Sequence, residues 1–299
     1  MTTLDILLPY YGDVSLLQAT VRSILAQTDP DWRLTVVDDG REPGVPEWFA
    51  ELDDDRVTYL RNEVNLGITN NYRKCLGLIE HEYAVMMGPD DIMLPNYVAT
   101  VRAALAAHPG ATLVQPGVEV IDGSGAVVHT LADETKRRLY APRFQGRRLM
   151  QGEELATSLL RGNWLYFPSL VWRTDLVREI GFRDDVEIIQ DLALVIDLLQ
   201  AGGSMVIDDT LCFQYRRHTS SASARTAASG VRFIEARQFF LSVADRLDAQ
   251  GWSKAARAAR WHTSTRLHAI TLLPGAVKSG QRAGVKRLLK FATATAKSR

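Results

Sequence analysis

The chain has 299 residues, an ordinary globular composition and a formal net charge of zero. Such a length can form one large α/β domain with an appendage, or two modest domains. No apolar run approaches the roughly 18 to 20 residues that cross a bilayer, and the N-terminus lacks the basic start and cleavage site of a signal peptide. We therefore expect a cytoplasmic protein whose two cysteines, Cys75 and Cys212, are reduced thiols.

Charge is distributed unevenly along the chain. From Gly251 onward there are eleven Lys and Arg residues and no Asp or Glu, whereas the first 250 residues carry 24 basic and 35 acidic residues. A basic tail on an acidic body predicts an anionic partner for the tail, either a membrane surface or nucleic acid.

The first 121 residues alternate short apolar runs with helical patterns. The runs predict strands over 4–11, 32–40, 56–62, 83–88 and 111–121, and the periodic stripes predict helices over 15–27, 46–52, 69–79 and 94–108. Strands that alternate with helices of this length pair in parallel through right-handed crossovers. The sequence therefore predicts an α/β fold with a doubly wound, mainly parallel sheet.

The second half of the chain is less regular. A hairpin turn near 122–127 and a polar, basic loop over 133–152 precede predicted helices at 152–161, 174–181 and 189–203 and predicted strands at 163–173 and 204–218. A Ser/Ala-rich linker over 220–230 then leads to three predicted helices, separated near Gly251 and near Pro274-Gly275. This organisation predicts one domain over 1–222 and a basic helical C-terminal extension over 223–299.

Polar and acidic residues follow the ends of the predicted parallel strands, at 9–13, 38–39, 62–67 and 88–91. Ligands bind at this edge of a doubly wound sheet. No Gly-rich dinucleotide fingerprint follows the first strand and no P-loop motif occurs in the sequence. The phosphates of a nucleotide would therefore be held in another way. We expect a divalent cation, bound by carboxylates, to hold them.

Six short motifs, in order along the chain, resemble those of family 2 glycosyltransferases of the GT-A fold. They are PYYGD (9–13), VVDDG (36–40), NLGITNNYRKCL (65–76), GPDD (88–91), QD (190–191) and YRRHTSSAS (215–223). The resemblance covers roughly the first 220 residues. It implies a hexosyltransferase-like enzyme that moves a sugar from a nucleotide-diphosphate sugar to an acceptor hydroxyl with inversion, in the synthesis of cell-surface polysaccharide or glycolipid.

The first two motifs imply residues for the nucleotide of the donor. By resemblance, Asp39 hydrogen-bonds the nucleobase. Pro9, Tyr11 and Asp13 match a donor-binding segment of the family in which the tyrosine ring packs on the base and the acid lies near the ribose. For Asp39 the alternative is a carboxylate that caps the following turn. For Tyr11 the alternative is an aromatic residue at the edge of the core. We assign Asp38 to structure.

The third motif begins a loop that enters a helix. Asn65 and Gly67 lie where the free backbone N–H groups of a helix start favour anions. By resemblance, Arg73 reaches the base or the diphosphate, with a solvated helix residue as the alternative interpretation.

The GPDD motif and the end of the domain imply a metal site. The family usually has Asp-x-Asp-Asp, whose carboxylates hold Mn²⁺ or Mg²⁺ against the donor diphosphate, and here Gly88 replaces the first acid. Asp90 matches the position that most often binds the metal, and Asp91 supports it. His218 is expected to reach the metal or the phosphates, and Arg216 and Arg217 to add phosphate contacts.

Asp191 is the expected catalytic base. By resemblance it takes the position of the acid in the family's Glu-Asp motif, although its neighbour here is Gln190. An inverting transfer needs one base to take the proton of the acceptor hydroxyl. The alternative is that Asp191 caps its helix, and three nearby acids compete for the role, namely Asp184, Asp185 and Glu187.

The expected partners are a nucleotide-diphosphate sugar, a saccharide or lipid-linked saccharide acceptor that packs against Trp164, and no nucleic acid. Core packing is the alternative for Trp164. In the basic tail, Val285, Leu288, Leu289 and Phe291 lie near basic residues, a pattern typical of a helix on an anionic membrane. A helix folded back on the acidic body explains it equally, so peripheral attachment at the inner face of the membrane is one of two open interpretations.

Two other classes of protein fit parts of the pattern. A sugar nucleotidyltransferase also uses a sheet and a divalent cation, but it usually carries a Gly-rich, basic signature after the first strand, which is absent here. A non-catalytic nucleotide-sugar binding or scaffold protein is favoured by Gly88 and Gln190, because both depart from the family at active positions.

Overall fold

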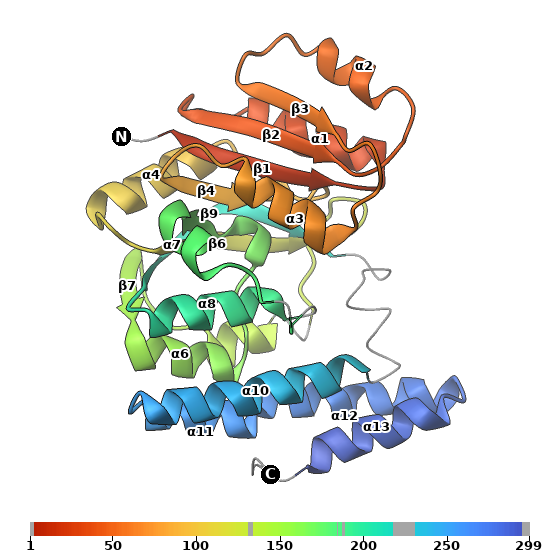
Figure 1. The fold of residues 1–299 in the computed structure, drawn as a ribbon, viewed down its shortest axis with the longest axis vertical. Coiled ribbons are helices and arrows are strands. Elements are labelled where there is room, and N and C mark those ends of the chain that lie inside the picture. The colour runs from red at the N-terminus through yellow and green to blue at the C-terminus, as the bar shows by residue number, and fades with distance from the viewer. Residues whose placement is uncertain (1–2, 131–133, 184, 187–188, 218–230, 295–299) are drawn as a thin grey trace.

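The computed structural model describes residues 3–130, 134–183, 185–186, 189–217 and 231–294. A central sheet is flanked by helices, and further helices lie beneath it at the C-terminal end of the chain (Figure 1). The strand order is β3-β2-β1-β4-β8-β6-β9-β5, and β7 pairs with β9 away from this path.

The N-terminal half of the sheet is parallel, as the alternating pattern predicts. The strands β1 (Leu4–Tyr10), β2 (Trp32–Asp38), β3 (Val57–Arg61) and β4 (Tyr83–Met86) pair in parallel. They are connected by α1 (Val14–Leu25), α2 (Val45–Ala50) and α3 (Ile68–Gly77). Since the carboxyl ends of these strands meet at one edge, the motif residues that follow them are brought together there.

Helices cover both faces of this half, which makes the sheet doubly wound. Successive side chains of a strand point to opposite faces, and β1 shows the consequence. Ile6 and Leu8 pack in the hydrophobic cluster that contains residues of α1 and of α4 (Tyr97–Ala107), whereas Leu7 packs with Cys75 of α3 on the other face. The predicted α/β fold with a mainly parallel, doubly wound sheet is confirmed.

The second half of the sheet is mixed. The strand β6 (Leu113–Ile121) pairs in parallel with β9 (Ser204–Arg216), whereas β8 (Val171–Arg173) runs antiparallel to both β4 and β6. Two short strands that the sequence analysis does not predict also pair antiparallel with β9, namely β5 (Ile92–Met93) and β7 (Arg147–Gln151). The basic segment expected as a loop over 133–152 therefore contains β7 and a π-helical turn, Lys136–Tyr140.

The predicted strand over 163–173 is wrong for most of its length. Residues Phe167–Ser169 form a 3₁₀ turn, η2, and only Val171–Arg173 pair in the sheet. Pro168 lies in that turn, and proline has no N–H for a ladder hydrogen bond. The helices α6 (Gly152–Arg161), α7 (Thr174–Ile180) and α8 (Gln190–Gln200) follow the predicted ranges closely.

The tail forms four described helices instead of the predicted three. They are α10 (Val231–Ala249), α11 (Ser253–Trp261), α12 (Thr263–Lys278) and α13 (Arg282–Thr293). Pro274 lies inside α12, and the unpredicted breaks are at His262 and Gly280, which both have positive φ. Residues of α10 and α11 share a hydrophobic cluster with α6 and α8, and the expected boundary after residue 222 lies outside the described residues.

None of the helices in the described part of the chain has the length and the apolar character needed to cross a bilayer.

Candidate active site

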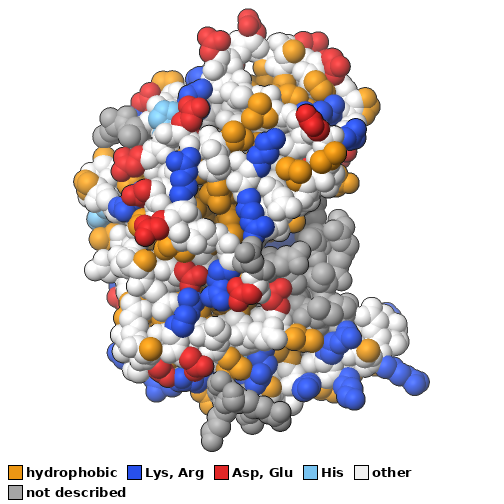
Figure 2. Space-filling view, in the orientation of Figure 1, with side chains coloured by type: hydrophobic (Ala, Val, Ile, Leu, Met, Phe, Trp, Pro, Cys, Tyr) orange, Lys and Arg blue, Asp and Glu red, His pale blue; other side chains and the backbone are white. Residues whose placement is uncertain are grey.

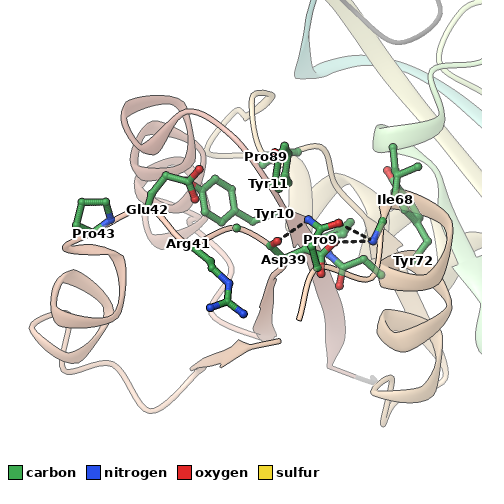
Figure 3. A pocket seen from close by; sticks show the side chains of 14 residues that line it. Pro9, Tyr10, Tyr11, Asp39, Arg41, Glu42, Pro43, Ile68, Tyr72 and Pro89 are labelled. Atoms are coloured by element: carbon green, nitrogen blue, oxygen red, sulfur yellow. Dashed lines mark hydrogen bonds between the residues drawn. The ribbon is translucent and has the colours of Figure 1, made fainter. Parts of the chain in front are cut away.

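A cavity of about 930 Å³ opens at the carboxyl edge of β1 and β2 (Figure 3). Five of the residues predicted to bind the donor line it together: Pro9, Tyr11, Asp39, Asn65 and Gly67. Because these residues come from three separate loops, only the parallel pairing of their strands brings them to one place. Further lining residues were not singled out from the sequence, among them Arg41, Glu42, Ile68 and Tyr72.

The carboxylate of Asp39 organises the loop that carries the third motif. Its Oδ1 accepts hydrogen bonds from the backbone N–H of Leu66 at 2.7 Å and from Nδ2 of Asn62 at 2.8 Å. Its Oδ2 accepts one from the N–H of Gly67 at 2.9 Å, and Asn65 donates to its backbone oxygen. Asp39 therefore holds residues 65–67 against the end of β2, whatever it contacts in a ligand.

The loop enters α3 at Gly67, which has a φ of +75°, a conformation that residues with a Cβ rarely adopt. Asn62 is fixed from the other side, since Lys74 donates to its Oδ1 at 2.6 Å and its Nδ2 lies 3.1 Å from Oδ1 of Asn71. A positive charge thus supports the amide that binds Asp39.

The neighbouring Asp38 has a structural role, as expected. Its side chain is fully buried and accepts hydrogen bonds from the N–H of Gly40, from the hydroxyl of Tyr59 and from Nε of Arg61. These contacts fasten the loop after β2 to β3.

Tyr11 is the most exposed aromatic residue at the cavity. Its side chain is 68% exposed, while the adjacent Tyr10 is buried and donates to the backbone oxygen of Gly12. Figure 3 shows the Tyr11 ring near Pro89 on the cavity wall. A large apolar ring left in solvent beside a cavity is a surface on which a flat ligand can stack.

The GPDD turn lies at the rim of the same cavity, because Pro89 lines it. A Cβ added to Gly88 would lie 2.6 Å from Oδ2 of Asp91 and 2.9 Å from Oδ1 of Asp90. The two carboxylates therefore converge over Gly88, in space that the missing side chain leaves open. The glycine that departs from the family pattern is required by the way these acids are packed.

The Asp91 carboxylate is buried beside a second carboxylate, that of Asp90. The residue is 1% exposed, and among the described residues its Oδ2 has no hydrogen-bond partner. Burial raises the pKa of Asp91 well above its usual range, and the charge of Asp90 raises it further. A cation between the two carboxylates would remove this penalty. Hard oxygen ligands of this kind fit Mg²⁺ or Mn²⁺, although no group of three metal-binding side chains forms among the described residues.

Arg216 fixes the turn from β9. Its backbone N–H donates to Oδ1 of Asp91 at 2.7 Å, and its Nε donates to the backbone oxygen of Asp90 at 2.7 Å. Its Nη1 donates to the backbone oxygens of Asp122 and Gly123 in the hairpin after β6. The guanidinium is thus committed to carbonyl groups, in contrast to the phosphate contact expected from the sequence. His218 lies outside the described residues.

Tyr72 connects the cavity with the turn. It lines the cavity, and burial raises the pKa of its phenol, with Cys75 and the carboxylates of Asp91 and Asp90 adding to the rise. The charges of the two acids thus act on the phenol of a residue that lines the cavity.

Three predicted donor residues do not appear among the described residues that line the cavity, namely Asp13, Arg73 and Asp90, of which Asp90 lies in the turn next to Pro89. Asp13 caps α1, where its Oδ1 accepts from the N–H groups of Ser15 and Leu16. Arg73 is exposed on α3, with its Nη1 3.4 Å from Oδ1 of Asn70. The position of Arg73 corresponds to the alternative that the sequence left open, whereas the capping role of Asp13 was not predicted.

Asp191 lies in the first turn of α8 and is half-buried. Nδ2 of Asn163 lies 3.5 Å from its Oδ2. Of the competing acids, Asp185 is paired with Arg183 at 2.7 Å, and Asp184 and Glu187 lie outside the described residues.

Trp164 contributes to a second cavity, of about 440 Å³, together with Tyr166 and residues of β6 and β9. Its side chain is 6% exposed, packs in the cluster of α6 and α8, and donates from Nε1 to Oγ of Ser158 at 3.1 Å. Trp164 is therefore mainly a core residue, which is the alternative that the sequence left open.

Sequence comparison identifies the family. The model of the family described as "Glycosyl transferase family 2" matches residues 5–173, which is more than half of the chain. The chain belongs to glycosyl transferase family 2. The matched segment contains the cavity, the Asp39 loop and the GPDD turn.

Relatives of this glycosyltransferase are distant. An uncharacterized protein of Mycobacterium tuberculosis is 24% identical over 246 residues, covering 80% of this chain and 74% of that protein. The Escherichia coli protein described as UDP-Glc:alpha-D-GlcNAc-diphosphoundecaprenol beta-1,3-glucosyltransferase WfgD is 27% identical over 92 residues, which is 31% of this chain and 36% of WfgD.

A solved structure shares the fold. Residues 1–349 of S. aureus TarS, crystallised in complex with UDP-GlcNAc, match with a TM-score of 0.60 and 11% identity. The match covers 97% of this chain and 90% of that one. It therefore extends beyond the matched family segment into the C-terminal helices.

Proposed function

We propose that the protein is an inverting, metal-dependent, hexosyltransferase-like enzyme that transfers a sugar from a nucleotide-diphosphate sugar to an acceptor hydroxyl. The observation that carries this proposal is the cavity at the ends of β1 and β2, which lies beside the Asp90–Asp91 turn. A nucleotide bound in this cavity would have its diphosphate next to the two acids. TarS, which has the same fold, was crystallised with UDP-GlcNAc and with UDP, which supports a nucleotide-sugar donor here.

The donor nucleotide would be bound by the first three motifs. The exposed ring of Tyr11 would stack on the base, and Pro9 would border the same wall. Oδ2 of Asp39 accepts one hydrogen bond in the described structure, and a carboxylate oxygen can accept a second from a base N–H. The amide of Asn65 and the N–H of Gly67 face this region, and Arg73 and Asp13 would act from its margin.

Asp90 and Asp91 would hold a divalent cation, Mn²⁺ or Mg²⁺, with His218 as the expected further ligand. Such a cation neutralises charge on the leaving nucleotide diphosphate. The buried Oδ2 of Asp91, which has no hydrogen-bond partner in the described part of the chain, supports this assignment. Arg216 would keep both acids oriented toward the cavity.

Asp191 would act as the base that takes the proton of the acceptor hydroxyl while that oxygen attacks the anomeric carbon. Asn163 would restrict the orientation of its carboxylate. Since Asn163 adjoins Trp164 in the chain, an acceptor against Trp164 or the neighbouring Tyr166 would lie near this base.

The acceptor would be a saccharide or a lipid-linked saccharide, and the pathway cell-surface polysaccharide or glycolipid synthesis. The relative WfgD is named as a glucosyltransferase for a diphosphoundecaprenol-linked sugar, which supports this class of acceptor. Reaction would then take place on the cytoplasmic side, at the inner face of the membrane.

The test is transfer or hydrolysis with a panel of nucleotide sugars and Mn²⁺, together with donor binding by calorimetry. We expect Asp191→Asn to bind donor normally and to lose at least about a hundredfold in turnover. Asp185→Asn is the matched control, because this neighbouring acid is exposed and paired with Arg183. An active Asp191→Asn would refute the base assignment, and wild-type protein that binds donors without turnover would indicate the scaffold alternative.

A further inference from the structure

The helix α12 carries apolar side chains on the face that points away from the rest of the protein. Leu267, Ile270 and Val277 are each 47% to 64% exposed. Their spacing along the chain places them on one side of the helix. Ala269 and Ala276 lie on the opposite side and are buried. Apolar side chains of this size left on one exposed face indicate a surface that meets something other than water.

The helix α13 places basic side chains on its exposed face. Arg282, Lys286 and Lys290 recur every four residues and are exposed, with the half-exposed Leu289 beside them. The other side of the helix is buried, because Leu288 and Phe291 pack in the cluster that holds α12 and α10. This corrects the sequence interpretation, in which Leu288 and Phe291 belong to the face that lies on a membrane.

The two helices pack against each other, so their exposed faces form one outer layer of the molecule. We call it the α12–α13 surface and define it by eight residues: Leu267, Ile270, Val277, Lys278, Arg282, Lys286, Leu289 and Lys290. In Figure 2 the lower right of the molecule, over α12 and α13, shows Lys and Arg side chains beside hydrophobic ones.

No acidic residue balances this charge from within the same segment. The sequence contains no Asp or Glu after Asp248. Within the described residues, none of the four cations of the α12–α13 surface takes part in an ion pair. The surface therefore combines unneutralised positive charge with exposed apolar groups.

The exposed Trp261 marks the border of this surface. It ends α11 and is 54% exposed, with the guanidinium of Arg266 on α12 lying 5.8 Å from its ring centre. Tryptophan is an amphipathic residue that is enriched at the boundary between water and lipid.

We propose that the α12–α13 surface docks on an anionic lipid bilayer. The apolar side chains would enter the region between headgroups and acyl chains, and the four cations would bind the lipid phosphates. Nucleic acid offers no partner for the apolar side chains of α12, and the acidic body would oppose it. The proposal rests on the surface itself and does not depend on the proposed transfer reaction.

The experiment is co-sedimentation of the full chain with vesicles of phosphatidylcholine alone and with vesicles of equal parts phosphatidylcholine and phosphatidylglycerol. We expect binding to the anionic vesicles only, weakening as salt is added. Lys278→Gln, Arg282→Gln, Lys286→Gln and Lys290→Gln combined should weaken partitioning by about fivefold per charge. Leu267→Ser, Ile270→Ser and Val277→Ser combined should also abolish most of the binding.

The matched control replaces three exposed apolar residues elsewhere, Val127, Leu139 and Leu149, by serine, and it should bind like the wild type. The charge variant decides the outcome if the apolar variant does not fold. Failure to bind anionic vesicles, or equal loss in the control, would overturn the proposal. So would a dimer, seen by light scattering, that the surface variants dissociate while vesicles have no effect, because the occupant would then be a second copy of the chain.

Because vesicle binding needs neither donor nor turnover, its failure is distinguishable from failure of the proposed reaction. Sugar transfer without binding to anionic vesicles would refute only the docking proposal. A chain that binds vesicles but transfers nothing would refute only the reaction.

Discussion

The backbone N–H of Arg216 donates a hydrogen bond to Oδ1 of Asp91, a residue 125 positions earlier in the chain. The side chain of Arg216 continues the contact, since it binds the backbone oxygens of Asp90, Asp122 and Gly123. One residue at the end of β9 thus joins the candidate metal-binding turn to the hairpin that follows β6. Because Arg216 is only 7% exposed, its hydrogen bonds are partly shielded from competition with water.

We expect Arg216→Met to lower the free energy of unfolding by about 2 to 3 kcal/mol, because three carbonyl groups lose a charged donor. Binding of a nucleotide sugar in the presence of Mn²⁺ should weaken as well. Urea denaturation and calorimetry measure the two effects. Arg217→Met is the control, since Arg217 is exposed, and it should change stability by less than about 0.5 kcal/mol. Equal effects of the two substitutions would contradict the positioning role.

Asp39→Asn tests whether this carboxylate organises the loop over 65–67. The amide has only one acceptor oxygen, so the N–H of Leu66 or that of Gly67 would face an N–H₂ group. We expect a loss of about 1 to 3 kcal/mol in the free energy of unfolding, together with weaker donor binding. Asp55→Asn, at an exposed position of the same half, should leave both unchanged. A variant of normal stability that fails only in binding would assign Asp39 to the ligand alone.

Gly88→Ala tests the packing of the two acids. The added methyl group would lie 2.6 Å from Oδ2 of Asp91, so the carboxylates must separate or turn. If they hold the cation, the concentration of Mn²⁺ needed for half-maximal activity should rise about tenfold or more. Gly123→Ala is the control, because its added methyl group meets no atom within 4 Å. An unchanged Mn²⁺ requirement would show that the convergence over Gly88 has no part in metal binding.

We expect the buried His262 to make the stability of the C-terminal helices depend on pH. It is fully buried between α11 and α12, stacks on Phe240 and donates from Nδ1 to the backbone oxygen of Ala259 at 3.0 Å. Its pKa is lowered from 6.5 to about 4, mainly by burial and in smaller part by the nearby charges of Arg266 and Arg237. The unfolded chain therefore binds the proton more tightly than the folded one.

It follows that the neutral His262 makes its full contribution to the free energy of unfolding above pH 6.5. This contribution is lost as the pH falls toward 4. The loss should reach about 3 kcal/mol in the free energy of unfolding. Urea denaturation between these pH values should give a steeper pH dependence for the wild type than for His262→Phe, which keeps an aromatic ring but cannot be protonated. Parallel curves would refute the assignment. His108→Phe, at a less buried site, serves as the control.

Most strands and helices of the N-terminal half could be predicted from local sequence patterns. The apolar runs and stripes over the first 121 residues predict β1 to β4 and α1 to α4, and the crossover rule then orders them. The same rule predicts that Asp39, Asn65 and Pro89 lie at one edge, since residues after parallel strands meet there. These inferences depend on periodicity and chain direction, which are properties of the sequence itself.

Long-range contacts decided the rest. The strand β5 has only two residues, and β7 has the polar, basic sequence RRLMQ, so neither forms an apolar pattern of its own; both pair with β9. α12 continues through Pro274, where the sequence predicts a break. The apolar side of α13 was visible as a pattern, yet only packing against α10 and α12 determined that it is buried.

The sequence by itself determined the family resemblance, the doubly wound sheet and the position of the acidic motifs at the ends of strands. Tertiary structure decided what each acid does: Asp38 and Asp39 fasten loops, and Asp91 keeps a buried oxygen without a partner among the described residues. The physical reason is that periodicity is encoded within a few residues, whereas the hydrogen-bond partner of a carboxylate depends on chain segments far away in sequence.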